Sequence, residues 1–324
     1  TVNKLYKEHL VSTNQYIKSL GKRIEQNFLR SYGNAKFDRV IQFCGYEDEM
    51  ILLYSQFKGQ KTIWVHNDML AEIKTRSNQR KDLLEYAYHT YDNVVAVTDD
   101  IVAPTQILAG KDKKINIVKN TIDYKTIRAN GDLPIALDET TKCSVEPEKF
   151  YEIMQSDAKK FINVGRYSPE KGHDRLIDAF YKLWQKDNSI YLIIMGGNSR
   201  AKKYEELIEK VNGMGLTDNV ILLLAVSNPY PIIKACDGFI LSSLYEGFGL
   251  VLAEADILGL PIVSTDITGP RTFMKKYGGT LIENSDEGVY KGLQMLYNGE
   301  IKPINVDYEA YNQECVAEFE KLFE

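Results

Sequence analysis

The chain has 324 residues, of which 44% are hydrophobic and 26% charged, so it can form two ordinary hydrophobic cores and two domains are expected. Its formal net charge of −5 gives no overall positive field, so no nucleic-acid partner is expected. No stretch approaches the roughly 20 consecutive apolar residues of a membrane span, and the scattered cysteines lack metal-ligand spacing, so no metal site is predicted. These features predict a cytoplasmic protein, with peripheral contact at the inner face of the membrane left open.

The first half of the chain shows the alternation of strands and helices that is typical of a parallel sheet. Residues 1–33 are predicted to be helical, whereas a doubly wound domain usually opens with a strand and a tight loop. Apolar runs, each followed by a segment of helical period, then occur at 39–45, 61–65, 93–97 and 115–118. The first domain is therefore expected to be a Rossmann-like α/β unit that is either truncated or built atypically.

The second half shows the same alternation after a segment of different composition. Residues 128–157 are rich in turn formers and acids, so the domain boundary is placed there and the first domain with its linker covers 1–157. Six further strand candidates follow: 160–165, 189–196, 219–224, 238–243, 260–265 and 279–283. They predict a second Rossmann-like domain over 158–305. Residues 306–324 have apolar side chains three or four positions apart, which predicts an amphipathic helix that returns to the first domain.

A first candidate ligand-binding motif follows the strand at 160–165. The chain turns through Gly165, and Ser168 before Pro169 is a good N-cap followed by an N1 proline, so a helix is expected to begin there. Arg166 and Lys171 flank this turn at the carboxyl end of a parallel strand, where open α/β sheets bind ligands, and two cations there suit a phosphate. The alternative is that both are solvated surface charges.

A second candidate motif follows the strand at 238–243. It consists of Glu246, Gly247, Phe248, Gly249 and Leu250. Two glycines let the backbone approach a ligand, and the amide groups of a helix that begins near Leu250 would hold a diphosphate. Glu254 stands eight residues after Glu246, so both carboxylates are expected to face one cleft and to accept hydrogen bonds from sugar hydroxyls. A helix-dipole preference for acids would explain Glu246 alone, but not Glu254.

Five short motifs stand in a specific order along the second half. They are Gly165-Arg166, Glu170-Lys171-Gly172, Glu246-Gly-Phe-Gly249, Glu254-Ala255 and Gly259-Leu-Pro261. Their order and spacing resemble the retaining GT4 family of glycosyltransferases, including its Glu-x7-Glu motif. The resemblance is strong over 160–283 and fainter over 38–123, and it implies a GT-B fold in which two Rossmann-like domains face a cleft.

The resemblance also implies residue roles. Arg166 and Lys171 would neutralise the donor diphosphate after Gly165, the amides of residues 247–250 would cap it, and Glu254 would bind the ribose hydroxyls. Glu246 and His66, which directly follows the strand at 61–65, would be the catalytic residues beside the transferred sugar. Residues 224–230 stand where relatives place the nucleobase. Asn120 and Gly197 are candidates for lining the cleft; a structural histidine and a turn-forming asparagine are the alternatives for His66 and Asn120.

The expected activity is a retaining transfer of a hexose or N-acetylhexosamine from a nucleotide sugar, with UDP-glucose or UDP-N-acetylglucosamine as the default donor. The acceptor would be a carbohydrate, a polyol phosphate or a protein of the cell envelope or surface. No Asp-x-Asp motif occurs, so no metal is expected, and no cofactor beyond the nucleotide-sugar co-substrate. The alternatives are an inactive GT-B partner or binding subunit, and a sugar-nucleotide epimerase or phosphorylase on the same fold.

Overall fold

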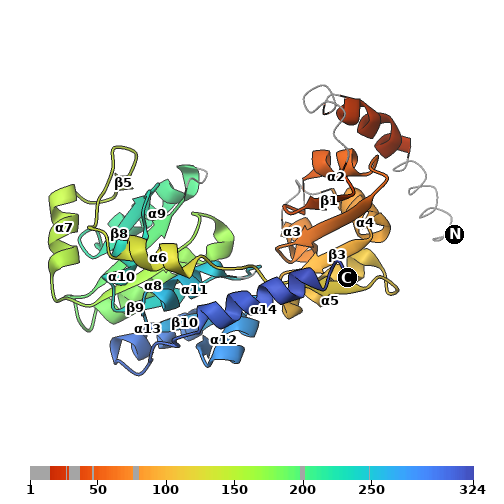
Figure 1. Ribbon diagram of the computed structural model, residues 1–324. Coiled ribbons are helices and arrows are strands. Elements are labelled where there is room, and N and C mark those ends of the chain that lie inside the picture. The colour runs from red at the N-terminus through yellow and green to blue at the C-terminus, as the bar shows by residue number, and fades with distance from the viewer. Residues whose placement is uncertain are drawn as a thin grey trace. The chain divides into compact units, whose positions relative to one another are not determined.

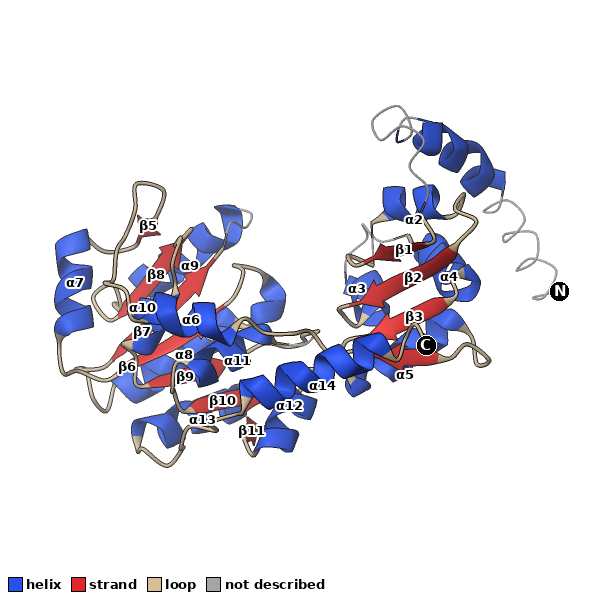
Figure 2. Ribbon diagram, in the orientation of Figure 1, coloured by secondary structure: helices blue, strands red, loops and turns tan. Residues whose placement is uncertain are grey.

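The computed structural model describes residues 15–26, 28, 37–45, 47–75, 80–197, 201–247 and 249–324 (Figure 1). The chain divides into two compact units. Unit 1 contains Thr1–Asn120 and Glu314–Glu324, and unit 2 contains Thr121–Gln313. Both units have a sheet with helices packed on it (Figure 2), which confirms the α/β class. No helix within the described ranges is long and apolar enough to cross a membrane.

Unit 1 contains a four-stranded parallel sheet in the order β1-β2-β3-β4. Its strands are β1 (Arg39–Gln42), β2 (Gln60–Val65), β3 (Asn93–Ala96) and β4 (Ile115–Ile117). The helices between them are α2 (Asp48–Tyr54), α3 (Met69–Thr75), α4 (Lys81–Thr90), the 3-10 turn η1 (Asp99–Ile101) and α5 (Val102–Ala109). Residues 15–26 are also helical. All four strands coincide with apolar runs; the central strands β2 and β3 are largely buried on both faces, whereas the edge strands β1 and β4 are mostly half-buried.

Unit 2 contains a seven-stranded sheet in the order β11-β10-β9-β6-β7-β8-β5, in which β5 alone pairs antiparallel. Its strands are β5 (Lys142–Cys143), β6 (Lys160–Val164), β7 (Tyr191–Gly196), β8 (Val220–Leu224), β9 (Gly238–Leu241), β10 (Ile262–Thr265) and β11 (Thr280–Ile282). Its helices are α6 (Tyr124–Gly131), α7 (Pro147–Gln155), the 3-10 turn η2 (Pro169–Lys171), α8 (His173–Trp184), α9 (Ala201–Gly213), α10 (Tyr230–Lys234), α11 (Leu250–Ile257), α12 (Pro270–Tyr277) and α13 (Asp286–Tyr297). The six expected strands are all present.

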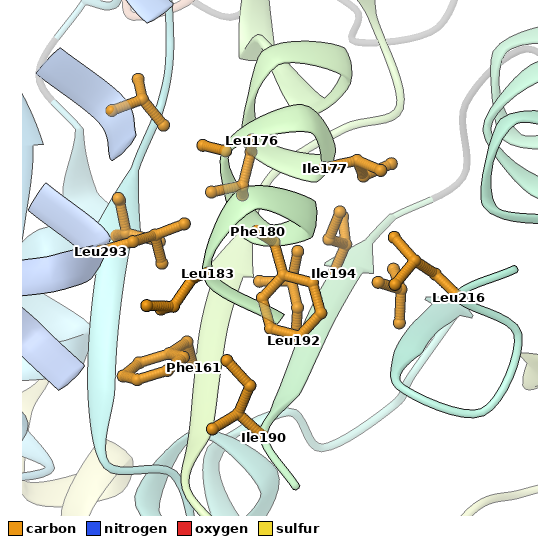
Figure 3. Close-up of a cluster of buried hydrophobic side chains, with 14 of the residues drawn as sticks. Phe161, Leu176, Ile177, Phe180, Leu183, Ile190, Leu192, Ile194, Leu216 and Leu293 are labelled. Atoms are coloured by element: carbon orange, nitrogen blue, oxygen red, sulfur yellow. The ribbon is translucent and has the colours of Figure 1, made fainter. Parts of the chain in front are cut away.

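The core of unit 2 forms where α8 packs on the sheet. Leu176, Phe180 and Leu183 recur three or four positions apart on α8, so they share one face of the helix. Figure 3 shows Leu183 beside Phe161 of β6 and Phe180 beside Leu192 of β7, with Leu176 further along α8, and all five side chains are buried. Each such side chain contributes about 1.5–3 kcal/mol through its removal from water. The packing therefore holds β6 and α8 firmly on either side of the loop that joins them.

The expected domain boundary at 128–157 differs from the structural division, which falls at Thr121. The segment carries the end of α6, strand β5 and helix α7, and all of them belong to unit 2. Strand β5 adds an edge to the sheet through pairing of Cys143 with Leu223, and Phe150 of α7 is fully buried. The acids and turn formers mark only the exposed loop between α6 and β5, so composition placed the boundary too late.

The last helix, α14 (Tyr308–Glu320), belongs to both units. Tyr308 is buried in unit 2, where its hydroxyl donates to the carboxylate of Asp256. Glu318 belongs to unit 1, where its two carboxylate oxygens accept from the main-chain nitrogen and the Nζ of Lys119 at 3.1 and 2.5 Å. The amphipathic helix predicted over 306–324 is thus anchored at each end by a different set of residues.

Candidate functional site

The strand order of unit 2 reverses between β6 and β9. From β6 the chain continues to β7 and β8 on one side, and then returns to β9 and β10 on the other. The loops after β6 and β9 start side by side, because the two strands are neighbours, and then lead to opposite sides of the sheet. Ligands of open α/β sheets bind at such a reversal. The loop after β6 contains Gly165 and Lys171, and the loop after β9 contains Glu246. The topology brings the two predicted motifs to one place.

Lys171 and Glu246 form an ion pair at the reversal. The Nζ of Lys171 lies 2.5 Å from Oε1 of Glu246, and each side chain is 13% exposed. The same oxygen accepts a hydrogen bond of 2.7 Å from Oγ of Ser243. Sequence interpretation assigned Lys171 to a phosphate and did not anticipate that Glu246 neutralises it. Ser243 was also missed, although it stands three residues before Glu246, the spacing of a local hydroxyl-carboxylate pair.

The loop after β6 is shaped by glycines. A helical turn does begin at Pro169 with Ser168 as its N-cap residue, as expected, but it is the short 3-10 turn η2; the α-helix α8 begins only at His173, because Gly172 takes a left-handed conformation with φ of 64° and ends η2. A Cβ at Gly172 would lie 2.2 Å from the carbonyl oxygen of Ser242. A Cβ at Gly165 would lie 3.1 Å from Cδ of Lys171. Glycine at 172 thus permits close approach to the neighbouring loop.

Arg166 lies at the surface of the same loop. Its side chain is 55% exposed, and Nη2 lies 3.4 Å from Oε1 of Glu170, which is buried. The guanidinium is therefore tethered on one side and open to solvent on the other. It remains a candidate ligand for an anionic group.

Helix α11 begins at Leu250, as expected. Its N-cap is Gly249, which has φ of 78° and supplies no side-chain hydrogen bond to the first amides, an arrangement that suits a bound anion. Gly247 is buried, and a Cβ at Gly269 would lie 1.8 Å from the carbonyl oxygen of Gly247. Phe248 lies outside the described residues.

Glu254 lies one turn into α11 and has different partners from Glu246. Burial raises the pKa of its carboxyl group, and a hydrogen bond with the side chain of Tyr230 opposes that rise. Tyr230 is the first residue of α10 and ends the 224–230 segment. The resemblance placed Tyr230 only within the 224–230 segment; its contact with Glu254 was not anticipated, because nothing in the local sequence indicates that Tyr230 meets α11.

The 224–230 segment is held in an unusual conformation. Ala225 has φ of 61°, which costs a non-glycine residue about 1–2 kcal/mol. Its carbonyl oxygen accepts from Oγ1 of Thr141 at 3.2 Å, and Oγ of Ser227 donates to Asp138. Residues just before β5 therefore fix the segment for which the resemblance implies a place at the nucleobase.

Two of the other predicted residues lie in unit 1. His66 directly follows β2; its ring centroid lies 4.6 Å from that of Phe43, and the backbone of Phe43 forms a hydrogen bond with it. Its Nε2 is buried without a hydrogen bond in the described structure. Asn120 follows β4, and its carbonyl oxygen accepts from Sγ of Cys315 at 3.7 Å. Gly197, in unit 2, is exposed at the end of β7.

Comparison with known proteins decides the family. Residues 145–313, more than half of the chain, match the family described as glycosyl transferases group 1. The chain belongs to this family. The match covers the reversal of the sheet and both loops that form the Lys171–Glu246 pair.

The relatives of this group 1 glycosyl transferase support the assignment. An uncharacterised glycosyltransferase of Methanocaldococcus jannaschii is 32% identical over 237 residues, which cover 69% of this chain and 54% of that protein. The N-acetylgalactosamine-N,N'-diacetylbacillosaminyl-diphospho-undecaprenol 4-alpha-N-acetylgalactosaminyltransferase of Campylobacter jejuni is 26% identical over 282 residues, covering 81% of this chain and 70% of that protein. The chain spans about half the length of the first relative.

The crystal structure of Anabaena HepE in complex with UDP has a TM-score of 0.68 and 15% identity, covering 94% of this chain and 80% of that one. The solved neighbours are GT-B glycosyltransferases, which confirms the expected fold class. The family match over residues 145–313 confirms the resemblance drawn from the five motifs. The residue roles that the resemblance implied stay predictions.

His66 of this group 1 glycosyl transferase should make unit 1 sensitive to acid. Burial lowers its pKa from the ordinary 6.5, so the unfolded chain binds more protons than the folded one below that pH. The free energy of unfolding should therefore fall as the pH drops below 6.5, by at most about 1.4 kcal/mol per unit from this group. His66→Gln should lose less stability than the wild type between pH 7.5 and 5.5 in urea denaturation. His89→Gln, at an exposed position of α4, is the control; an equal acid response in both variants would contradict the assignment.

Proposed function

We propose that this chain is a retaining glycosyltransferase that moves a hexose or N-acetylhexosamine from a UDP-linked donor to an acceptor of the cell envelope or surface. The observation that carries the proposal is the Lys171–Glu246 pair beside the start of α11, at the reversal of the sheet. A cation, a helix start and a carboxylate there match the diphosphate and the sugar of one ligand.

The ion pair suggests how donor binding is coupled to sugar contact. A diphosphate brings negative charge to Lys171 and competes with Glu246 for it. Glu246 then exchanges an ion pair for hydrogen bonds from sugar hydroxyls while Ser243 Oγ still orients it. Diphosphate binding therefore releases the carboxylate at the moment when the sugar arrives.

The chemical step needs stabilisation of the leaving group more than a nucleophile from the protein. The bond between the anomeric carbon and the diphosphate oxygen breaks, and the acceptor oxygen bonds to that carbon from the same face. The acceptor proton passes to the departing phosphate oxygen. Negative charge that develops on the diphosphate is met by Lys171, Arg166 and the amides at the start of α11, which are already oriented. We propose that this charge stabilisation replaces a metal ion.

The choice of UDP and of an envelope acceptor rests on the relatives. HepE was crystallised with UDP, and the Campylobacter relative is named for transfer to a sugar on diphospho-undecaprenol. For this chain we propose the same class of donor, and an acceptor that is a carbohydrate, a polyol phosphate or a protein. An acceptor on a lipid would require peripheral contact with the inner face of the membrane.

Calorimetric titration with UDP, with GDP and ADP alongside and EDTA present, tests the proposal. Micromolar binding of UDP alone in EDTA is expected. Glu254→Gln should weaken UDP binding about tenfold or more, because a half-buried carboxylate that accepts from the ribose is lost. Glu209→Gln on the exposed face of α9 is the matched control and should bind normally. Absence of nucleotide binding by the wild type would favour an inactive partner subunit instead.

A further inference from the structure

Arg175 is a buried arginine that sequence interpretation did not single out. It is the third residue of α8 and is 8% exposed. Its Nε and Nη2 donate to the carbonyl oxygen of Ser242 at 2.8 and 2.5 Å, and Nη2 also donates to that of Ser243 at 2.8 Å. All three hydrogen bonds go to consecutive main-chain carbonyls at the end of β9.

The position is unfavourable for a cation by the ordinary rules of helices. The first turn of a helix carries a partial positive charge, which disfavours arginine there. Burial lowers the pKa of the guanidinium, and the charge of Asp286 opposes that effect. Only a guanidinium has donors in a fixed fork that reaches two successive carbonyl oxygens. The contact with Ser242 and Ser243 therefore explains why arginine stands here.

These two serines carry the link between the two loops of the candidate site. Oγ of Ser242 donates to the carbonyl oxygen of Lys171 at 3.0 Å, and the main-chain nitrogen of Leu244 donates to that of Glu170 at 2.7 Å. Oγ of Ser243 donates to Glu246, the partner of Lys171. Arg175 thus holds the main chain of Ser242 and Ser243, whose side chains contact the Lys171 carbonyl and Glu246.

We propose that Arg175 is a positioning residue that sets the Ser242–Gly247 loop against Lys171, and so prepares the Lys171–Glu246 pair for a nucleoside diphosphate. The second half of this statement rests on the proposed function. The first half concerns the ligand-free protein, so the two can fail separately.

Hydrogen exchange of the Leu244 amide tests the first half without a ligand. Arg175→Met keeps the length of the side chain and removes its donors. This variant should raise the exchange rate of the Leu244 amide about tenfold, because the hydrogen bond from this amide to the carbonyl oxygen of Glu170 loosens. The exchange rates of the core amides of β7 should stay unchanged. Arg175→Lys restores one donor and should give an intermediate rate. An unchanged Leu244 rate in Arg175→Met would overturn the proposal.

A double-mutant cycle on UDP affinity tests the second half. Arg175→Met should weaken UDP binding about tenfold in the wild-type background, and by less than about twofold in the Lys171→Met background, because it acts through Lys171. Arg175→Lys should recover part of the affinity. Equal losses of UDP affinity in the wild-type and Lys171→Met backgrounds would mean that Arg175 only supports the fold. Failure of the wild type to bind UDP, together with faster Leu244 exchange in Arg175→Met, would refute the proposed function and leave the positioning role intact.

Discussion

UDP should bind about tenfold to a hundredfold more weakly when Lys171 is replaced by methionine. In the proposed function the Nζ of Lys171, which pairs with Glu246 in the ligand-free protein, binds the diphosphate, and a hydrogen bond to a charged partner contributes about 1.5–3 kcal/mol. Calorimetry at constant ionic strength measures the effect. Lys182→Met removes a lysine from the exposed side of α8, where it pairs loosely with Glu287 at 3.7 Å, and should leave UDP affinity unchanged.

The companion variant Glu246→Gln should not weaken UDP binding. If Glu246 competes with the diphosphate for Lys171, the loss of its charge should leave UDP affinity equal or higher, while sugar transfer falls. Weaker UDP binding by Glu246→Gln would show that the carboxylate assists the nucleotide directly. Normal binding by Lys171→Met would remove Lys171 from the site altogether.

Asp256→Ala should lower the free energy of unfolding by about 3 kcal/mol. The buried carboxylate accepts from the main-chain nitrogens of Asn305 and Val306 at 2.8 and 3.0 Å and from the hydroxyl of Tyr308 at 2.9 Å. Burial beside this carboxylate raises the pKa of Tyr308, so its hydroxyl stays a donor. Alanine removes one hydrogen bond from each of the three groups: the buried amide of Val306 loses its acceptor, the amide of the exposed Asn305 loses its own, and the Tyr308 hydroxyl keeps only the carbonyl oxygen of Ala253 at 3.2 Å. Each lost hydrogen bond costs about 1 kcal/mol or more.

Urea denaturation followed by circular dichroism measures this loss. Asp256→Asn keeps one acceptor oxygen and should lie between the wild type and Asp256→Ala. Asp178→Ala removes an exposed carboxylate that pairs with Lys210 at 2.7 Å, and should cost less than about 1 kcal/mol. A loss below about 1 kcal/mol for Asp256→Ala would mean that the start of α14 finds other acceptors.

The strands could be predicted because buried parallel strands are nearly continuous apolar runs. The two-residue strand β5 could not, since Lys142 and Cys143 carry no such run and pair only through the edge of β8. The helical start at Ser168 and Pro169 was predicted, but not that it yields only the 3-10 turn η2. The left-handed Gly172 ends this turn, so α8 begins at His173.

The sequence indicated which residues lie at the candidate site, but not how they contact one another. Gly165, Lys171 and Glu246 could be named as candidates because each stands in a turn that follows a strand, and their roles stay predictions. The contact between Lys171 and Glu246 spans a strand crossover, and the hydrogen bond between Tyr230 and Glu254 joins two helices. Arg175 looks like an ordinary charged residue in sequence, because only its burial against the end of β9 distinguishes it.

The shared helix α14 limits how relatives can exchange parts. Unit 2 is one uninterrupted stretch, 121–313, whereas unit 1 needs the residues on both sides of it. A chimera made by a single crossover near residue 120 would bring a foreign terminus to Lys119 and lose its contact with Glu318. A transplant of 121–313 at two junctions would keep that contact. For recombination, unit 2 is therefore an insertion within unit 1, and exchange of the whole of 121–313 is the replacement that keeps both parts of unit 1 from one parent.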